Sequence, residues 1–289
     1  MNTFAAATPT TTAISVLVLT KNEEQDLPAC LDSVAWSDDV HVFDSHSTDG
    51  TVAIATARGA HVTARVFDNY AAQRNAALHG LPFKHRWVLT LDADERVPPA
   101  LARSMTEFLA SATTDVAACR MRRRDYFGRT WLRHSQISPY YIRLVQPARV
   151  HYERAVNEVL RVDGAIHDLA EPFDHYPFSK GMRHWLDKHN VYSSVEAQCV
   201  VDASTDAIPF SVSKAFFAHD FNERRWHQKE LFYRLPLRPV IKFLYVYLWR
   251  RGFLDGYAGF TYAVLQSMYE YMIVLKTREL RNRQPALAP

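Results

Sequence analysis

The sequence has few cysteines and no long uninterrupted apolar segment. Its three cysteines, Cys30, Cys119 and Cys199, are widely spaced, and no Cys-x-x-Cys pair is present. An odd number at such spacing argues against a disulfide framework or a zinc knuckle, so we expect a protein of the reducing cytoplasm. A membrane-spanning helix needs about 20 apolar residues with few charges, and charged residues interrupt every candidate segment here.

The formal net charge is also small, at +3 over 289 residues. That charge does not by itself call for a nucleic-acid partner, and no nucleic-acid-binding motif appears. Residues 1–12 have neither a basic start nor an apolar core. They therefore do not resemble a secretory signal, and we expect a disordered tail there.

The first part of the chain alternates short apolar runs with helical patterns. The runs lie at residues 14–19, 39–43, 60–66, 86–91 and 116–121. Strands alternating with helices predict an α/β fold with a mostly parallel sheet flanked by helices. Right-handed crossovers place all the strand-to-helix loops at one edge of such a sheet, and ligands bind at that edge.

Three polar clusters fall at this predicted edge, at residues 21–23, 44–49 and 92–94. Asp92 and Asp94 could share one Mg²⁺ or Mn²⁺, since such ions accept one or two carboxylates plus substrate phosphates. The cation would make a diphosphate a better leaving group. Asp44 could accept hydrogen bonds from a nucleobase or ribose, although residues 47–49 also suit a helix N-cap. The alternative for Asp92 and Asp94 is an ordinary turn or cap.

A basic side chain also lies in a helical segment near this edge. Arg74, close to a helix N-terminus, would suit a diphosphate. The alternative is a solvated helix face.

The last third of the chain is rich in aromatic residues. Residues 240–249 are nearly all apolar, and Tyr262, Leu265, Tyr269 and Met272 recur near helical spacing. These patterns predict a helical, aromatic-rich C-terminal appendage. Aromatics with basic neighbours suit a helix lying in a bilayer surface. An ordinary helical core or a dimer face is the alternative.

Several segments carry a resemblance to a known family. In chain order they are SVLVLTKNEEQDLPACLDSV, FDSHSTDGTVAIA, QRNAAL and WVLTLDADE. Together they resemble the family 2 glycosyltransferases of GT-A fold over residues 14–125. The later segments HYERAVNEVL, EPFDHYPFSKGMRHWLDKHNVYS and RPVIKFLYVYLWRRGFLDGYAGFTYAV resemble the bacterial lipopolysaccharide-core β-1,4-glucosyltransferase-like branch.

The resemblance implies a domain division. A glycosyltransferase domain would occupy residues 13–230, with a nucleotide-sugar half at 13–125 and an acceptor half at 126–230. Residues 231–289 would form a helical region that associates with a membrane or packs on the protein.

The resemblance also implies roles for individual residues. The nucleotide-sugar would be held by Thr20, Glu23, Asp44, Arg74 and Asp92. The divalent metal, Mg²⁺ or Mn²⁺, would be bound by Asp94 with Asp92 and His175.

An inverting enzyme further needs a general base for the acceptor hydroxyl. Glu158 is the candidate, because Asn157-Glu158 falls where the branch shows a His-Glu pair. Asn157 departs from that pattern, and Glu153 is the alternative base.

The expected function is therefore an inverting, metal-dependent hexosyltransferase. It would move a hexose from a nucleotide-sugar donor to a lipopolysaccharide-core or lipid-linked glycan acceptor. It would act in the cytoplasm, at the inner face of the cytoplasmic membrane, through peripheral contact by its C-terminal region. Two alternatives stay open: a polyprenyl-phosphate sugar transferase, and a non-catalytic nucleotide-binding scaffold at the membrane.

Overall fold

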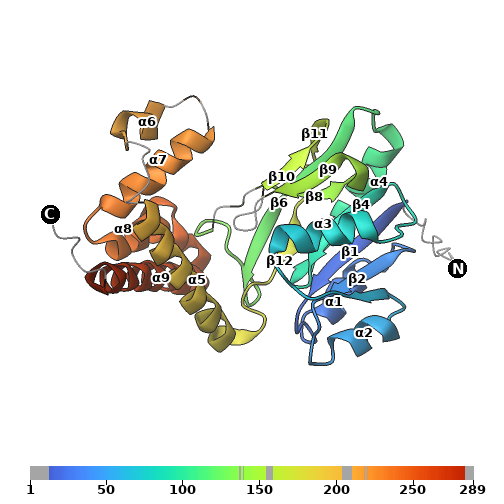
Figure 1. Ribbon diagram of the computed structural model, residues 1–289, viewed down its shortest axis with the longest axis horizontal. Helices are drawn as coiled ribbons and strands as arrows, with labels where there is room; N and C mark the ends of the chain where they lie inside the picture. The colour runs from blue at the N-terminus through green and yellow to red at the C-terminus, as the bar shows by residue number, and fades with distance from the viewer. Residues whose placement is uncertain are drawn as a thin grey trace, which may run out of the picture. The chain divides into compact units, whose positions relative to one another are not determined.

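The computed structural model divides the chain into two compact units (Figure 1). The described residues are 13–136, 138, 140–153, 159–203, 210–217, 219 and 221–283. The expected tail at 1–12 and the expected base Glu158 lie outside them. The first unit comprises Met1–Gly128 and Ser138–Ser179, and the second comprises Arg129–Ile137 and Lys180–Pro289. The domain boundaries expected after residues 125 and 230 remain predictions.

The first unit contains the sheet and the helices that cover it. Its strands are β1 (Ile14–Thr20), β2 (Val40–Asp44), β3 (His61–Ala64), β4 (Trp87–Asp92), β5 (Glu95–Arg96), β6 (Val116–Phe127), β8 (Tyr140–Val145), β9 (Val150–Glu153), β10 (Val159–Val162), β11 (Ala165–Asp168) and β12 (Phe173–His175). Its helices are α1 (Leu27–Ser33), α2 (Thr51–Ala57), α3 (Tyr70–Gly80), α4 (Pro99–Ser111) and the 3-10 turn η1 (Pro147–Arg149). The expected run of strands and helices up to residue 121 is confirmed.

The main sheet is mixed and mostly parallel. Its strand order among the described residues is β3-β2-β1-β4-β8-β6-β12-β5. The four strands from β3 to β4 are parallel, whereas β8 runs antiparallel to both β4 and β6. Strands β9 and β10 form a separate antiparallel pair. The predicted α/β class is therefore confirmed.

Alternation along β1 divides the core into two layers. Ile14, Val16 and Val18 pack against buried side chains of α1, α2 and α4 on one face of the sheet. Leu17 packs on the other face with apolar residues of α3 and β9. Because successive strand residues point to opposite faces, the apolar run of β1 is buried on both sides.

The structure confirms the predicted start of one helix, α3, and differs from the prediction for another, α2. Asn69 caps α3 as expected, because its side-chain oxygen accepts a 2.9 Å hydrogen bond from the backbone N–H of Ala72. Residues 47–49 precede the cap position of α2, which begins at Thr51 after Gly50, but the Asp49 carboxylate still accepts a 3.0 Å hydrogen bond from the backbone N–H of Thr51. The side chain of Ser47 bonds Asp44 instead.

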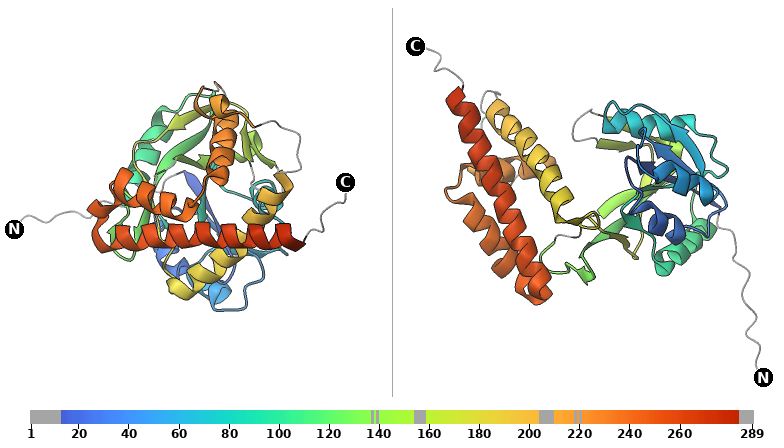
Figure 2. Two further views of the ribbon diagram at one scale, coloured as in Figure 1. Left: turned by 90° about the vertical axis from the view of Figure 1, so that its left-hand side faces the viewer. Right: turned by 90° about the horizontal axis from the view of Figure 1, so that it is seen from below.

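The second unit is mainly helical. It contains the short strand β7 (Thr130–Trp131) and the helices α5 (Gly181–Ala203), α6 (Val212–Phe217), α7 (Phe221–Arg234), α8 (Arg238–Leu244), the π-helical turn η2 (Tyr245–Trp249), the 3-10 turn η3 (Gly252–Asp255) and α9 (Gly256–Arg283). Helix α9 packs along α5 and α8 (Figure 2). The predicted helical, aromatic-rich appendage is confirmed. Within the described residues, no helix is both long and apolar enough to cross a bilayer.

Candidate active site

The carboxyl ends of β1, β2 and β4 meet at one edge of the sheet. The register pairs Thr20 with Asp44 and Leu19 with Asp92. Parallel neighbours end side by side, so the polar residues that follow each strand share one edge. The predicted convergence of Thr20, Asp44 and Asp92 is thus found in the structure, while their roles stay predictions.

Asp44 is the centre of a buried hydrogen-bonded group at this edge. Its side chain is 1% exposed. It accepts hydrogen bonds from the Thr20 hydroxyl at 2.8 Å, and from the backbone N–H and the hydroxyl of Ser47 at 2.7 and 2.5 Å. These bonds compensate the cost of burying the carboxylate, and they hold the end of β1 against the loop after β2.

The loops after β1 and β2 are joined by further hydrogen bonds. The Lys21 ammonium donates to the carbonyls of Ser45 and His46 at 2.8 and 2.6 Å. The side-chain oxygen of Asn22 accepts from the backbone N–H of Thr48 at 2.8 Å. Both Asn22 and His46 adopt left-handed backbone angles, with φ of 55° and 57°. The two loops therefore form one fixed structure at the edge of the sheet.

Glu23 lies in the same loop, directly before α1. Its backbone N–H donates to the hydroxyl of Thr51 at 2.7 Å, and its carbonyl accepts from the N–H groups of Asp26 and Leu27. Its side chain is half-buried. The predicted role of Glu23 in binding the nucleotide remains a prediction.

Three consecutive side chains of α3 reach three different strands. Gln73 donates to the Ser45 hydroxyl, just after β2, at 3.0 Å. The Arg74 guanidinium donates to Asp92, at the end of β4, at 3.1 Å. Asn75 exchanges two 2.8 Å hydrogen bonds with the backbone of Tyr152 in β9. Gln73 and Arg74 are buried, so the alternative of a solvated helix face is wrong for these two residues.

Asp92 has a cation on each carboxylate oxygen. Arg74 contacts Oδ1 and Arg143 contacts Oδ2, each at 3.1 Å. Burial alone would raise the pKa of Asp92, but the two guanidinium groups outweigh it and hold that pKa well below the usual range. Asp92 is therefore ionised and fixed in orientation.

Arg143 and Glu95 form a buried ion pair behind Asp92. The Arg143 guanidinium lies 2.5 Å from Glu95 Oε1, and the side chain of Glu95 is 1% exposed. The other oxygen of Glu95 accepts from the backbone N–H of Asp92 at 3.1 Å. Burial raises the pKa of Glu95, and the charge of Arg143 opposes that rise. Sequence reasoning missed both residues. An arginine within the apolar run YIRLV was the available signal, because a buried cation needs a partner.

His175 lies between two carboxylates. Its Nε2 is 3.3 Å from Asp94 Oδ2, and its Nδ1 contacts Asp125 Oδ1. Strand pairing creates this contact, because β12 places His175 beside Asp125 of β6. Burial lowers the pKa of His175, but hydrogen bonds to Asp125 and Asp94 outweigh it and raise the pKa to about 9. Sequence reasoning missed Asp125, which no motif marks.

Asp94 and His175 are the residues at this edge that a divalent cation could use as protein ligands. Both oxygens of Asp92 are paired with arginines, whereas Asp94 and His175 point at one another. Across the described part of the chain, no group of three or more His, Cys, Asp or Glu side chains is arranged to hold a metal. Mg²⁺ commonly binds through one or two carboxylates plus substrate phosphates. A histidine whose far nitrogen bonds a carboxylate is a common metal ligand.

Glu153, the alternative base, belongs to the β9–β10 pair. Its carboxylate accepts a 2.9 Å hydrogen bond from Arg161 on the neighbouring strand. Both side chains are substantially exposed. This contact is an ordinary cross-strand ion pair.

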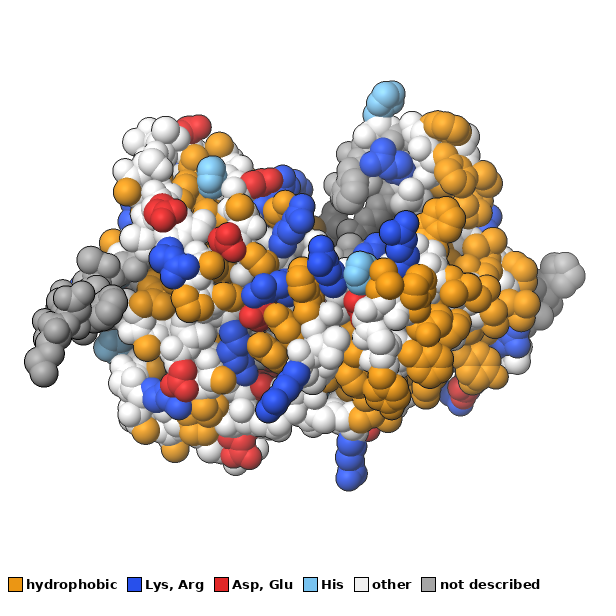
Figure 3. Space-filling view, turned by 180° about the vertical axis from the view of Figure 1, so that it is seen from behind, with side chains coloured by type: hydrophobic (Ala, Val, Ile, Leu, Met, Phe, Trp, Pro, Cys, Tyr) orange, Lys and Arg blue, Asp and Glu red, His pale blue; other side chains and the backbone are white. Residues whose placement is uncertain are grey.

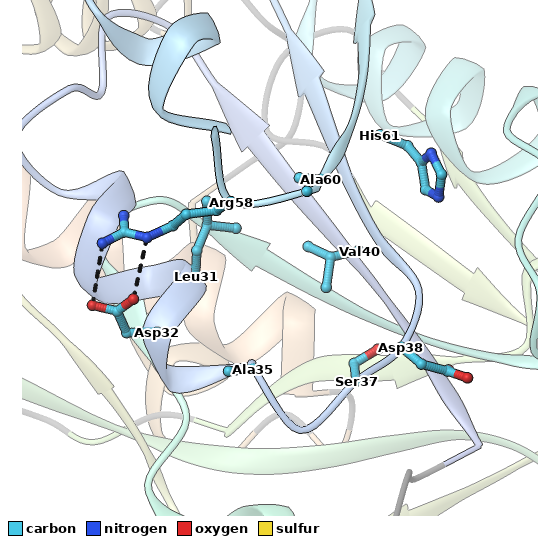
Figure 4. Close-up of a pocket in the computed structure, with 10 residues that line it drawn as sticks. Leu31, Asp32, Ala35, Ser37, Asp38, Val40, Arg58, Ala60 and His61 are labelled. Carbon is cyan, nitrogen blue, oxygen red and sulfur yellow. Dashed lines mark hydrogen bonds and ion pairs between the residues drawn. The ribbon is translucent and has the colours of Figure 1, made fainter. Parts of the chain in front are cut away.

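A hollow lies at the opposite edge of the sheet (Figure 4). Its lining includes Val40 and His61, the first residues of β2 and β3. Figure 4 shows Arg58 paired with Asp32 there, at 3.2 Å. None of the polar residues described above lines it, so it is separate from the candidate site.

Comparisons with known proteins agree with the resemblance noted in the sequence. The family model described as Glycosyl transferase family 2 matches residues 15–168. The lipopolysaccharide core biosynthesis glycosyltransferase LpsC of Rhizobium meliloti is 25% identical over 276 residues, covering 89% of this chain and 92% of that protein. An uncharacterized glycosyltransferase of Rickettsia bellii is 24% identical over 93% of this chain and 87% of its own length.

Solved structures resemble a smaller part of the chain. Glucosyl-3-phosphoglycerate synthase of Mycobacterium tuberculosis, crystallised with Mg²⁺ and uridine diphosphate, gives a TM-score of 0.33 at 23% identity. The match covers 41% of this chain and 45% of that one. A structure of the same enzyme with Mn²⁺, UDP-glucose and glycerol 3-phosphate gives 0.34 at 24% identity, covering 39% and 45%.

Proposed function

The chain belongs to glycosyltransferase family 2, and from that premise we propose an inverting hexosyltransferase that uses a nucleotide-sugar donor. The acceptor is a lipopolysaccharide-core or lipid-linked glycan, and the enzyme acts at the inner face of the cytoplasmic membrane through peripheral contact. The placement of Asp44 and Asp92 at the carboxyl ends of β2 and β4, on either side of β1, carries the proposal, and Asp94 follows two residues after Asp92. Similarity to LpsC over 89% of this chain supports the choice of acceptor.

Binding of the donor falls to the joined loops after β1 and β2. The base would bind beside the Thr20–Asp44 pair and take over some of the hydrogen bonds that now bury Asp44, and Glu23, in the adjoining loop, would contact the ribose. Arg74 faces the diphosphate while Asp92 orients its guanidinium. Because Arg143 and Glu95 fix Asp92 from behind, the arrangement is formed before the donor arrives, which lowers the cost of binding.

Asp94 and His175 would hold Mg²⁺ or Mn²⁺, with His175 giving up its Nε2 proton when the cation binds and the donor's phosphate oxygens serving as further ligands. When bound, the cation supplies positive charge that stabilises the departing diphosphate. Asp125 keeps the ring of His175 in place through Nδ1. Asp92, already paired with two arginines, orients the diphosphate-binding guanidinium and is not a direct ligand in this proposal.

Glu158 acts as the general base. It removes the proton of the acceptor hydroxyl as the new bond forms between that oxygen and the anomeric carbon. The bond between the anomeric carbon and the phosphate oxygen breaks in the same step, and the nucleoside diphosphate leaves with the electron pair. One displacement from the opposite face inverts the configuration.

Donor binding is the first test. The purified chain is screened by thermal shift against nucleotide-sugars, with and without Mg²⁺ or Mn²⁺. Selective binding to the folded state raises the melting temperature, so we expect one nucleotide-sugar to do so more strongly when the cation is present. If no nucleotide-sugar raises it under either condition, the proposal fails.

The general base is the second test. Glu158→Gln should keep donor binding and lose transfer by about 10²- to 10⁴-fold, the range of general-base catalysis. Retained transfer would favour a polyprenyl-phosphate acceptor, which is already ionised and needs no strong base. A third outcome concerns the unmodified chain. If it binds the donor but neither transfers the sugar to any acceptor nor hydrolyses the donor, it is a non-catalytic scaffold.

A further inference from the structure

The turn between α8 and α9 exposes large apolar side chains. Trp249 and Tyr257 are 82% and 81% exposed, and Leu254 and Phe253 are 56% and 47% exposed. With Phe260 these residues define the aromatic face. Figure 3 shows hydrophobic side chains gathered over the helical second unit. A concentration of exposed apolar groups marks an interaction surface.

Contacts between rings make part of this face continuous. Phe253 and Phe260 both pack against Tyr247, with ring centroids 6.3 and 5.6 Å apart. Phe243 lies against the same tyrosine at 5.3 Å. Phe253 and Phe260 are therefore the exposed members of a packed cluster of rings, and Trp249, Leu254 and Tyr257 extend the exposed apolar surface in the neighbouring turn.

The backbone beneath the aromatic face is firmly held. Asp255 accepts hydrogen bonds from the backbone N–H groups of His134 and Ser135, at 3.0 and 2.8 Å, and from the Ser135 hydroxyl at 2.6 Å. The Arg250 guanidinium donates to the carbonyls of His134 and Gln136 at 3.1 and 3.2 Å. Polar groups thus anchor the turn from below, and its apolar side chains are exposed on a fixed support.

Two glycines bring the same turn close to its neighbours. A Cβ atom on Gly259 would lie 1.9 Å from the carbonyl oxygen of Gly252, and one on Gly252 would lie 2.6 Å from that of Val246. Only glycine allows backbones to approach so closely. The turn that lies between Trp249 and Tyr257 is therefore tightly packed.

Charges in the segment that carries the aromatic face are almost all positive. Between residues 231 and 269 the only carboxylate is Asp255, which is buried and bonded as described. The same segment carries five basic residues, Arg234, Arg238, Lys242, Arg250 and Arg251, of which Arg238 is buried. No described carboxylate pairs with Arg250 or Arg251. The segment therefore presents apolar rings and positive charge together.

We infer that the aromatic face binds the surface of an anionic phospholipid bilayer. Tryptophan and tyrosine prefer the boundary between headgroups and acyl chains, and lysine and arginine are attracted to acidic lipid. The segment lies on the surface, since no described helix could cross the bilayer. This inference specifies the membrane contact named in the proposed function, but it needs neither the donor site nor the transfer step.

Vesicle binding tests the inference with the full chain. Co-sedimentation is measured with vesicles of phosphatidylcholine alone and of equal parts phosphatidylcholine and phosphatidylglycerol. We expect binding to the mixed vesicles and little to the neutral ones. The variant Trp249→Ala/Leu254→Ala/Tyr257→Ala should bind the mixed vesicles about a hundredfold more weakly, because apolar burial supplies most of the affinity.

A matched variant controls for general loss of apolar surface. Tyr271→Ala/Leu275→Ala removes exposed apolar groups from a later part of α9 and should bind like the unmodified chain. Equal loss in both variants, or no preference for acidic vesicles, would overturn the inference. So would a dimer that forms without vesicles and is broken only by the aromatic-face variant, because the face would then join two copies.

The charge contribution is tested separately. Arg251→Gly and Lys242→Gln should each weaken binding to the mixed vesicles about fivefold, and the effect should shrink at high salt. Tryptophan quenching by brominated phosphatidylcholine should be smaller in Trp249→Phe than in the unmodified chain. Unchanged quenching would contradict insertion of this ring.

Donor binding separates this inference from the proposed function. The aromatic-face variant should keep any thermal shift caused by the nucleotide-sugar, because none of its changes lies at the strand ends. Failure of vesicle binding with intact donor binding would refute the inference alone. Failure of donor binding with intact vesicle binding would refute the proposed function alone.

Discussion

The two units differ in where their charged and apolar side chains lie. In the first unit, Arg143 pairs with Asp92 and Glu95, and Asp44 is bonded to Thr20 and Ser47. In the second unit, a buried carboxylate, Asp255, lies beneath a turn whose aromatic side chains face outward.

Both arrangements cost stability, and the comparison suggests why each is present. A buried charge must be paired or it destabilises the fold, and an exposed apolar patch promotes association. In the proposed function, the paired charges of the first unit fix the geometry of a site for a charged ligand. In the further inference, the anchored turn of the second unit presents its rings to an anionic bilayer.

The largest expected effect concerns the buried charges. Arg143→Met should lower the free energy of unfolding by about 3–5 kcal/mol, because it leaves Glu95 buried without its cation. Denaturant unfolding measures the change. Arg120→Met, which breaks the exposed pair with Asp168, should cost no more than about 1 kcal/mol.

The same variant has a predicted pH dependence. Burial raises the pKa of Glu95, and loss of Arg143 raises it further. A carboxyl group whose folded-state pKa lies above its unfolded value favours folding when protonated, so stability falls as pH rises through the folded pKa. Arg143→Met should therefore be more destabilised at pH 8 than at pH 5. A loss independent of pH would contradict this account of Glu95.

The second effect concerns catalysis in the first unit. Asp94→Asn should reduce transfer by about 10²- to 10³-fold, since it weakens the stabilisation of the leaving diphosphate. Steady-state transfer rates at saturating donor measure the loss. Asp115→Asn, at an exposed position next to β6, should leave the rate unchanged. Equal rates for Asp94→Asn and the unmodified chain would remove Asp94 from the mechanism.

The third effect concerns the support of His175. Asp125→Asn should raise the Mn²⁺ concentration needed for half-maximal donor stabilisation by about 10- to 100-fold, the usual cost of losing such a partner. The thermal shift measured across a Mn²⁺ titration checks it. Asp174→Asn is the matched control, because Asp174 adjoins His175 but pairs with Arg124.

The fourth effect concerns Asp255 in the second unit. Asp255→Asn should lower the free energy of unfolding by about 1.5–3 kcal/mol, because hydrogen bonds to the charged carboxylate are weakened. Weaker vesicle binding should accompany the loss if the turn supports the aromatic face. Glu279→Gln, in an exposed pair with Arg283, should change stability by less than about 0.5 kcal/mol.

The smallest effect tests the backbone of the same turn. Arg251 has a φ of 60°, a conformation that costs a non-glycine residue about 1–2 kcal/mol. Arg251→Gly should therefore stabilise the fold by about 0.5 kcal/mol, after the greater freedom of unfolded glycine is deducted. Arg278→Gly, within α9, should instead destabilise it by about 1 kcal/mol. If both substitutions changed the free energy of unfolding in the same direction, this account of the turn would be contradicted.

The sequence predicted the parts of the fold that follow from local patterns. Apolar runs marked β1, β2 and β4, and Asn69 marked the start of α3 as expected. Order along the chain and right-handed crossovers then placed Thr20, Asp44 and Asp92 at one edge.

Pairings between distant segments were not predictable in this way. Asp125 meets His175 only because β12 pairs with β6, and Arg143 reaches Asp92 from β8. The start of α2 also differed, because Ser47 bonds Asp44 and leaves Gly50 at the cap position. Competition between tertiary and local hydrogen bonds decides such cases.

The central claim is that the donor binds at the carboxyl edge of the sheet. The most direct test compares donor affinity after a substitution at that edge and after one at the opposite edge. Calorimetry with the nucleotide-sugar found by the screen, in the presence of Mn²⁺, compares the unmodified chain with Asp44→Asn and Asp38→Asn. Asp44 lies at the carboxyl edge, whereas Asp38 lines the hollow at the other. We predict at least about tenfold weaker binding for Asp44→Asn, the effect of roughly one lost charge-assisted hydrogen bond, and unchanged binding for Asp38→Asn. Unchanged binding for Asp44→Asn, with a loss for Asp38→Asn, would contradict the account.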